Sequence, residues 1–173
     1  MIGNDLVFFD TYHHGDASRF KRKFRKICSE EELIILPEKD ERTYDIVWSI
    51  KEACYKAFQR EFNFSMKLNP LQFEILSIEL SLGFWETLVN WKGSEVKIFS
   101  LIKNEFVYSF TSHSTHHYFN FSVSMPKQLK SKLKISKSIP LYTKTNNLPY
   151  ILISDQLEPL SITHENAKIA FAW

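Results

Sequence analysis

The spacing of the apolar residues changes part-way along the chain, and this change restricts the folds that the chain can adopt. Between residues 43 and 60 the apolar side chains, among them Ile46, Ile50 and Ala57, recur every three or four positions, which is the period of an amphipathic helix. After Pro70 the spacing becomes two, which is typical of strands that bury one face. Because helices come early and strands late, the sequence predicts an α+β fold.

Local signals add three elements before the long helix. The apolar run at residues 3–9 is typical of a short buried strand, and residues 16–27 are expected to form a helix. The segment from Ser29 to Glu32 has the form of a capping box at the start of a second helix, which Pro37 ends. All three elements precede the long helix. The sequence contains no internal repeat.

The second half of the chain is predicted to be rich in strands. Residues 70–125 are expected to form an antiparallel meander with turns at residues 92–94 and 103–105. The basic segment 127–137 is interpreted as a loop, and closing strands are expected at residues 150–154 and 168–173. With 173 residues, 44% of them hydrophobic, we expect one folded domain over residues 1–173.

The distribution of apolar residues excludes several classes of protein. The longest apolar runs are far shorter than the roughly 20 residues that a membrane-spanning helix needs. The first residues lack the basic and then apolar pattern of a secretory signal peptide, so we expect a cytoplasmic protein. Cys28 and Cys54 lie in predicted helices and are interpreted as small buried side chains rather than a disulfide or a zinc site.

The positive charge of the chain is concentrated, although the net charge is only +2. Residues 19–26 carry six cations in eight positions, and five further lysines lie between residues 127 and 137. Clustered cations attract phosphates and acidic proteins. The alternative is that both stretches are ordinary solvated surfaces.

Two carboxylates stand out from their surroundings. Asp5 lies within the apolar strand, where a carboxylate needs a cation, a metal or a hydrogen-bond partner. Glu52 points away from the apolar stripe of the long helix, on a face that it shares with Trp48 and Tyr55, so we expect that face to be covered. If the two carboxylates meet, they make a Mg²⁺ site of hard oxygen ligands. The alternative for Glu52 is a surface pair with Lys56, four residues on.

The histidines point to chemistry at one position. His113, His116 and His117 lack the spacing of a zinc motif. His164 follows the hydroxyls of Ser161 and Thr163, and the three together can hold a phosphate; the alternative is a plain turn.

Three segments, in this order along the chain, resemble motifs of the 4′-phosphopantetheinyl transferase superfamily, of the holo-acyl-carrier-protein synthase type. The first is similar to the family's Gly-x-Asp strand, the second to its Trp-x-x-Lys-Glu-Ala-x-x-Lys helix, and the third to its Ser-x-(Ser/Thr)-His segment. The helix motif is the most specific of the three. The corresponding residues here are Gly3, Asp5 and Val7; Trp48, Lys51, Glu52, Ala53 and Lys56; and Leu160, Ser161, Thr163 and His164.

The resemblance implies a fold, a reaction and a set of site residues. The fold would be transferase-like, with an antiparallel sheet packed against the long helix and an inserted β-rich region at about 70–125. Coenzyme A would be the donor, and a serine of an acidic acyl or peptidyl carrier protein would be the acceptor, as in fatty acid biosynthesis. Asp5 and Glu52 would bind Mg²⁺, with Glu52 or a water that it orients as the general base. Lys56 would neutralise the phosphates, and the coenzyme A contacts would come from Ser161, Thr163 and His164.

The resemblance also implies how the chain meets its partners. The carrier protein would dock on basic residues of the first helix, namely Arg19, Arg22, Lys23 and Lys26. A single set of motifs implies a homotrimer with its site between subunits. The chain departs from the family at Val7, where longer members have a third acid, and at Asn147-Leu148, which replaces a Gly-Lys pair before Pro149.

Two other functions are compatible with the same residues. One is a non-catalytic module whose basic helix binds nucleic acid or an acidic partner, which predicts salt-dependent binding that is indifferent to Mg²⁺. The other is a metal-dependent phosphohydrolase that releases pantetheine phosphate to water without a carrier protein.

Overall fold

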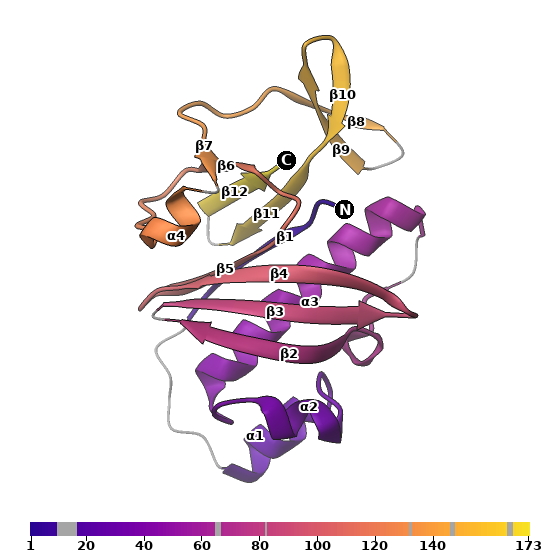
Figure 1. Cartoon of the computed structure of the whole chain (residues 1–173), viewed down its shortest axis with the longest axis vertical. Coiled ribbons are helices and arrows are strands. Elements are labelled where there is room, and N and C mark those ends of the chain that lie inside the picture. The colour runs from indigo at the N-terminus through magenta and orange to yellow at the C-terminus, as the bar shows by residue number, and fades with distance from the viewer. Residues whose placement is uncertain (10–16, 65–66, 82, 132, 146–147, 166–167) are drawn as a thin grey trace.

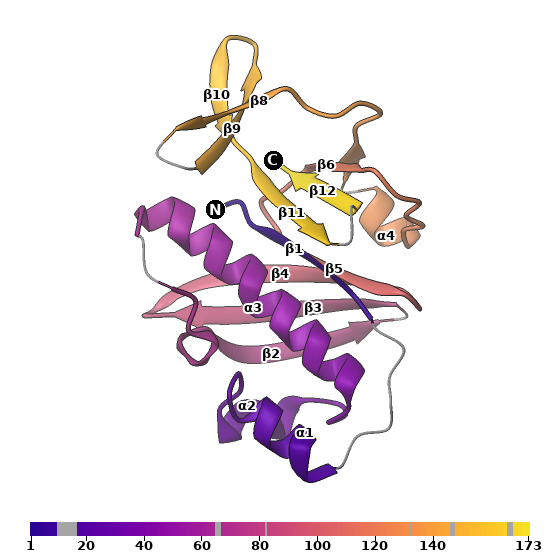
Figure 2. The same cartoon turned by 180° about the vertical axis from the view of Figure 1, so that it is seen from behind.

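The computed structural model describes residues 1–9, 17–64, 67–81, 83–131, 133–145, 148–165 and 168–173, and the side chains of residues 17–20 are not described. Strand β1 (Asn4–Phe8) is followed by α1 (Ala17–Phe24), α2 (Glu30–Ile35) and the long helix α3 (Glu41–Phe62). A 3-10 turn, η1 (Pro70–Gln72), leads into the strands. Figures 1 and 2 show α3 crossing one face of a sheet, α1 and α2 at one end of the molecule and the C-terminal strands at the other. The α+β prediction is confirmed.

Helix α3 forms where the apolar period predicted it and extends a little further at both ends. Asp40 caps its start, where the carboxylate Oδ1 accepts a hydrogen bond from the backbone N–H of Thr43 at 2.7 Å. Asn63 ends it in the left-handed conformation, with φ of 47°. The buried stripe of the helix packs against β1 and the sheet and includes Ile46, Ile50, Ala53, Cys54, Ala57 and Phe58.

The largest sheet has five antiparallel strands in the order β1-β5-β4-β3-β2. Its last four strands are the predicted meander: β2 (Glu74–Ser81), β3 (Phe84–Trp91), β4 (Ser94–Ile102) and β5 (Phe106–Thr111). Lys92 and Gly93 make the tight turn between β3 and β4, both with positive φ. The prediction was wrong beyond β5, because β6 (His116–Phe119) leaves the meander and pairs in a different sheet.

Two smaller sheets complete the fold. One has the order β11-β12-β6-β7, with β7 (Lys134–Ile135), β11 (Ser161–Glu165) and β12 (Lys168–Ala172). The other is a hairpin-like sheet of β8 (Tyr142–Thr145), β9 (Leu148–Ile153) and β10 (Gln156–Pro159). The closing strands are therefore confirmed, whereas β8, β10 and β11 were missed.

The loop prediction for residues 127–137 was wrong. Residues Lys127–Lys130 form a short helix, α4, and β7 follows it. Leu129 and Leu133 are buried against the sheet beside Phe106 and Phe110, while the lysines around them stay exposed. Two buried leucines in a mostly polar segment are too weak a periodic signal to predict from sequence.

A buried ion pair fixes α2 to α3. The predicted capping box is present, with Ser29 Oγ accepting from the Glu32 N–H and Glu32 reaching back to the Ser29 N–H. The other Glu32 carboxylate oxygen lies 2.6 Å from the Lys51 ammonium, and both side chains are at most 1% exposed. Lys51 also donates to the carbonyl oxygens of Ile27 and Pro70. The first lysine of the helix motif therefore holds the fold together and does not enter the pocket described below.

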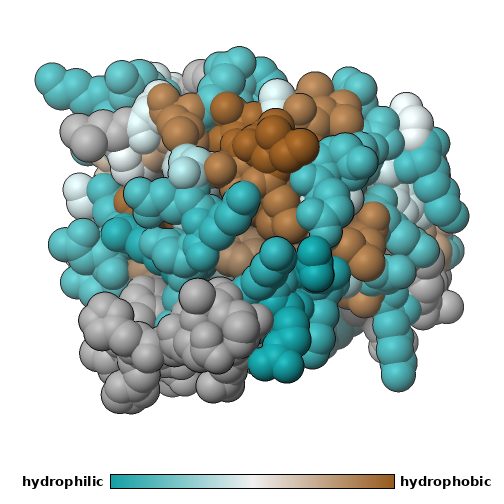
Figure 3. All heavy atoms as spheres, turned by 90° about the horizontal axis from the view of Figure 1, so that it is seen from below, coloured by the Kyte–Doolittle hydropathy of each residue, from teal (hydrophilic) through white to brown (hydrophobic). Residues whose placement is uncertain are grey.

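Cys28 and Cys54 are buried free thiols, as predicted, and burial raises the pKa of Cys28 to about 12. Among the described residues, no helix is long and apolar enough to cross a membrane. Seen from below, apolar side chains gather among hydrophilic ones (Figure 3). The exposed apolar residues of α2 and β2 include Ile34, Leu76 and Leu80.

Candidate functional site

Strand β1 lies between two neighbours that satisfy its backbone in different ways. On one side it pairs with β5, with Asp5 opposite Ser109. On the other side, alternate side chains of β11 accept hydrogen bonds from alternate N–H groups of β1. Ser161 Oγ accepts from Asn4 at 3.0 Å, Thr163 Oγ1 accepts from Leu6 at 3.2 Å, and the Glu165 carboxylate accepts from Phe8. The period of two in β11 thus positions β1 and, with it, Asp5.

Gly3 allows β1 to lie directly on α3. A Cβ at this position would come within 2.2 Å of the Ala53 carbonyl oxygen and 2.7 Å of the Ala57 nitrogen. Gly3 of the strand motif therefore packs directly against Ala53 and Ala57 of α3. This contact sets the separation of Asp5 from α3.

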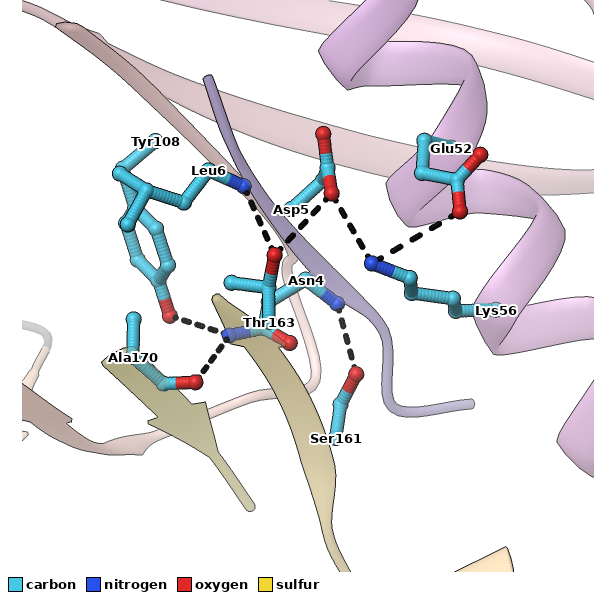
Figure 4. Close-up of polar contacts among 9 residues, drawn as sticks. All are labelled: Asn4, Asp5, Leu6, Glu52, Lys56, Tyr108, Ser161, Thr163 and Ala170. Carbon is cyan, nitrogen blue, oxygen red and sulfur yellow. Dashed lines mark hydrogen bonds and ion pairs between the residues drawn. The ribbon is translucent and has the colours of Figure 1, made fainter. Parts of the chain in front are cut away.

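Asp5 and Glu52 face the same cation. The Lys56 ammonium lies 2.9 Å from Asp5 Oδ1 and 3.8 Å from Glu52 Oε1, as Figure 4 shows. Thr163 Oγ1 donates a further hydrogen bond to Asp5 Oδ1 at 3.2 Å. Burial raises the pKa of the Glu52 carboxyl above its ordinary value, the Lys56 charge opposes this rise, and the Asp5 charge adds to it. The buried Asp5 carboxylate thus has two partners, the Lys56 ammonium and the Thr163 hydroxyl.

These side chains line a pocket of about 470 Å³ between α3 and β11. His164 lies on the exposed side of β11 and contributes to the pocket wall, and Trp48 contributes from α3. Glu165, which the sequence reasoning missed, also lines it. The other lining residues are Asp5, Leu6, Val7, Glu52, Lys56, Ile162 and Thr163. The three motif segments meet here within one chain.

The structure gives Ser161 a position that its motif alone does not reveal. Its hydroxyl is buried against the Asn4 N–H, and Ser161 is not among the residues that line the pocket. Thr163 lines the pocket, although its hydroxyl is already bonded to Leu6 and Asp5. Contact of Ser161, Thr163 or His164 with a phosphate stays a prediction, and of the three only His164 is exposed. The segment is a strand and not the plain turn that was its alternative.

The aromatic face of α3 is covered in two different ways. Trp48 is half-buried and lines the pocket. Tyr55 packs instead against Phe64 and Phe73, with ring centroids 6.0 and 6.2 Å apart. The prediction that this face is covered is confirmed for Tyr55, which the protein itself covers, whereas cover of Trp48 by a ligand or another subunit stays a prediction.

Arg60 fastens the C-terminal strands to α3, a role that sequence reasoning missed. Its guanidinium donates to the carbonyl oxygens of Pro149 at 2.9 Å and Leu160 at 2.6 Å, and it lies over the Tyr150 ring. The signal available in the sequence was an arginine one turn beyond Lys56, on a helix whose other face is apolar.

A second missed feature is a buried polar chain behind Asp5. Asn4 Nδ2 donates to the Tyr108 hydroxyl at 3.1 Å, and that hydroxyl lies 2.8 Å from His117 Nδ1. His117 Nε2 lies 3.3 Å from the Ser114 carbonyl oxygen. Burial lowers the pKa of His117 to about 4. His117 is thus a buried core histidine whose neutral form is favoured.

Asp5 and Glu52 together offer carboxylate oxygens to a single cation. The Lys56 ammonium shows that one cation can approach both Asp5 and Glu52. Carboxylate oxygens are ligands that Mg²⁺ prefers, and this ion commonly keeps several waters and is bound by one or two carboxylates plus substrate phosphates. In the described part of the chain, no group of three or more acids, histidines or cysteines is placed to hold a metal. The chemistry of these two carboxylates is compatible with an ion such as Mg²⁺, and their binding of one stays a prediction.

The basic helix α1 lies near the N-terminal half of α3 (Figure 2). Arg22 of α1 is exposed, as is Lys26, which lies beyond the end of α1 at Phe24 rather than in the helix as predicted; Lys23 is half-buried and bonded to Glu41 at 3.2 Å. The side chain of Arg19 lies outside the described part of the chain, as does Asn147. The helix thus presents cations to solvent, as its sequence predicts.

A larger hollow of about 950 Å³ lies at the other end of α3, and it holds none of the motif residues. Its walls include Arg42, which donates to the Lys103 carbonyl oxygen. Size alone would favour this hollow, but the residues of the three motif segments line the smaller pocket.

Comparison with models of protein families gives a match over the N-terminal two-thirds of the chain. The family model described as the 4′-phosphopantetheinyl transferase superfamily matches residues 1–112, that is, 112 of the 173 residues. The match includes Asp5, Glu52 and Lys56 and most of the region expected to be inserted, and it ends before His164. A search of curated proteins found no match.

Proposed function

Because the chain belongs to the 4′-phosphopantetheinyl transferase superfamily, we propose that it transfers the 4′-phosphopantetheine arm of coenzyme A to a serine of an acyl or peptidyl carrier protein. The observation that supports this most directly is the pocket in which Lys56, His164 and two carboxylates lie together. Lys56 and His164 can bind the oxygens of a pyrophosphate. The raised pKa of the Glu52 carboxyl suits a group that accepts a proton.

The reaction needs one proton acceptor and charge stabilisation. The serine Oγ attacks the phosphorus that carries pantetheine, the bond from that phosphorus to the bridging oxygen breaks, and adenosine 3′,5′-bisphosphate leaves. Glu52, or a water hydrogen-bonded to it, takes the serine proton. Lys56 and His164 stabilise the negative charge that grows on the leaving phosphate.

Asp5 and Glu52 would hold Mg²⁺, and the ion when bound would supply positive charge to the pyrophosphate oxygens. Val7 stands where a third acid occurs in longer members, so two protein carboxylates are expected. Ser161 and Thr163 contribute by locking β1, which orients Asp5.

The decisive experiment is intact mass spectrometry of an apo acyl carrier protein incubated with this protein, coenzyme A and Mg²⁺. We expect the carrier to gain one phosphopantetheine, and EDTA to prevent the gain. Glu52→Gln should nearly abolish transfer, since the amide neither takes a proton nor carries charge. Glu61→Gln is the matched control, because Glu61 is exposed near the end of the same helix and lies outside the pocket. No gain with several carrier proteins would contradict the proposal and favour the non-catalytic module; free pantetheine phosphate without carrier would favour the hydrolase.

His164→Ala separates a donor-binding role from a structural one. His164 is exposed on the pocket wall, so its loss should raise the KM for coenzyme A while the melting temperature stays unchanged. An unchanged KM would remove His164 from the binding of coenzyme A.

Carrier docking is proposed on the exposed cations of α1, because carrier proteins are acidic. Arg22→Glu should raise the KM for the carrier but not for coenzyme A. Lys127→Glu, an equal charge change on the exposed surface of α4, is the control. Equal effects of the two variants would argue against a specific surface on α1.

The assembly is proposed to be a cytoplasmic homotrimer of single-domain chains, as in the short members that the motif order resembles. The three motif segments already meet within one chain, so a second copy is not needed to bring them together. Light scattering at assay concentration tests the trimer, and a monomer that retains transfer activity would show that assembly is dispensable.

A further inference from the structure

The Lys56 ammonium occupies the space between the two carboxylates proposed as metal ligands. It lies 2.9 Å from Asp5 Oδ1 and 3.8 Å from Glu52 Oε1, and Figure 4 shows both interactions converging on it. Asp5 is nearly buried, so its charge is poorly screened by water and depends on a nearby cation. Lys56 supplies such a cation.

A divalent ion and the ammonium are in conflict at this position. Both are attracted by the same carboxylate oxygens, and like charges at such separations repel strongly where water is scarce. The lysine is the group that can move, because its chain is long and flexible. Its side chain is 24% exposed on the pocket wall, whereas Asp5 is held by Thr163 and the backbone of β1.

We propose that Lys56 blocks the binding of a divalent ion to Asp5 and Glu52 until the pyrophosphate of the donor draws the ammonium away. We call this block the lock. Without an anion in the pocket, a divalent ion must displace the ammonium and therefore binds weakly. When a pyrophosphate enters, the ammonium turns toward its oxygens, and the carboxylates become available to the ion. Cation and donor then bind as a coupled pair. This inference rests on the proposed function, because it assumes that Asp5 and Glu52 receive the ion.

The coupling works in both directions. A donor that strengthens binding of the ion by some factor must have its own binding strengthened by the ion by the same factor. Coenzyme A should therefore bind more tightly with saturating Mg²⁺ than in EDTA, and part of this gain should disappear when Lys56 is removed. The lock also keeps Asp5 neutralised while the pocket is empty.

The test measures binding of Mn²⁺ alone, by electron paramagnetic resonance of the free ion, without coenzyme A or carrier. Lys56→Met removes the lock and should bind Mn²⁺ about tenfold more tightly than the wild type, a typical size for coupling between sites. Lys97→Met is the matched control, because it removes the same charge from a pair with Glu86 on strands β4 and β3, which β5 separates from β1. Its Mn²⁺ affinity should stay within about twofold of the wild type.

Lys56→Arg provides a second variant in case the methionine variant is unstable. It keeps a cation beside the carboxylates and should bind Mn²⁺ as weakly as the wild type. Equal Mn²⁺ affinity in the wild type and Lys56→Met would overturn the inference, as would tighter binding in Lys56→Arg that equals that of Lys56→Met.

The outcome is separable from that of the transfer assay. Tighter Mn²⁺ binding by Lys56→Met, in a protein that transfers nothing, would support the lock and contradict the transferase proposal. Phosphopantetheine transfer by the wild type, together with an unchanged Mn²⁺ affinity in Lys56→Met, would support the transferase proposal and contradict the lock.

Discussion

Replacement of Gly3 by alanine is expected to damage the packing on which the pocket depends. The added Cβ would lie 2.2 Å from the Ala53 carbonyl oxygen, 2.7 Å from the Ala57 nitrogen and 2.9 Å from the Ala57 Cβ. Since unstrained contacts begin beyond 3 Å, β1 must move away from α3 by about 1 Å. Two of the three atoms are backbone, so no side-chain rotation relieves the clash.

The expected cost lies at the upper end of the range for overpacked cores, about 3 kcal/mol. For a chain of this length, that corresponds to a fall in Tm of about 6–12 °C. Urea denaturation and calorimetry would measure both quantities. Coenzyme A binding should weaken as well, because Asp5 moves with β1 away from Lys56 and Glu52.

Gly93→Ala is the control for this experiment. Gly93 has φ of +85° and nothing within 4 Å of an added Cβ, so this variant reports backbone strain alone, about 1 kcal/mol. If Gly3→Ala costs no more than Gly93→Ala, the close approach of β1 to α3 is refuted. If Gly3→Ala is destabilised but binds coenzyme A normally, the position of Asp5 does not depend on this contact.

Three further predictions test the interior. Lys51→Met leaves the buried Glu32 carboxylate without its ion-pair partner and should lower the free energy of unfolding, measured by urea denaturation, by about 3–5 kcal/mol. Lys97→Met, which breaks an exposed pair, should change stability little. Equal losses in the two variants would show that burial of the pair is unimportant. The imidazole of His117 should stay neutral in the folded state and take up a proton on unfolding between its ordinary pKa of 6.5 and about 4. Stability should therefore fall by about 3 kcal/mol as the pH falls through this window, and His117→Asn should lack that part of the slope; an equal slope in both proteins would contradict the buried neutral state. Arg60→Met removes two hydrogen bonds to backbone carbonyls and should speed amide exchange in β9 and β11 more than in β3, and uniform exchange would mean that the arginine does not fasten the C-terminal strands.

The sequence by itself determined the elements whose burial is periodic. Helix α3 follows the spacing of three and four from Ile46 to Phe58, because it buries one face. Strand β3 buries every second residue, as the spacing of two predicts, whereas β5 is buried on both faces. The capping box was predictable because its partners, Ser29 and Glu32, are three residues apart. Short elements such as α4, which buries one leucine, have too few periodic positions to be predicted in this way.

The site was predictable in its residue types but not in its contacts. The motif resemblance named Asp5, Glu52, Lys56 and His164, and the geometry brings all four to one pocket. Glu165 and Arg60 were missed because their roles depend on partners far along the chain.

Tertiary structure alone decided how the site is held. Thr163 reaches Asp5 across 158 positions, and the side chains of β11 complete the edge of β1 where another strand would ordinarily pair. Lys56 could satisfy Glu52 within its own helix, but the close packing of Gly3 on α3 brings Asp5 nearer to it. The physical reason is that local spacing fixes which face of an element is buried, whereas the partner of a buried charge is chosen by packing between elements distant in sequence.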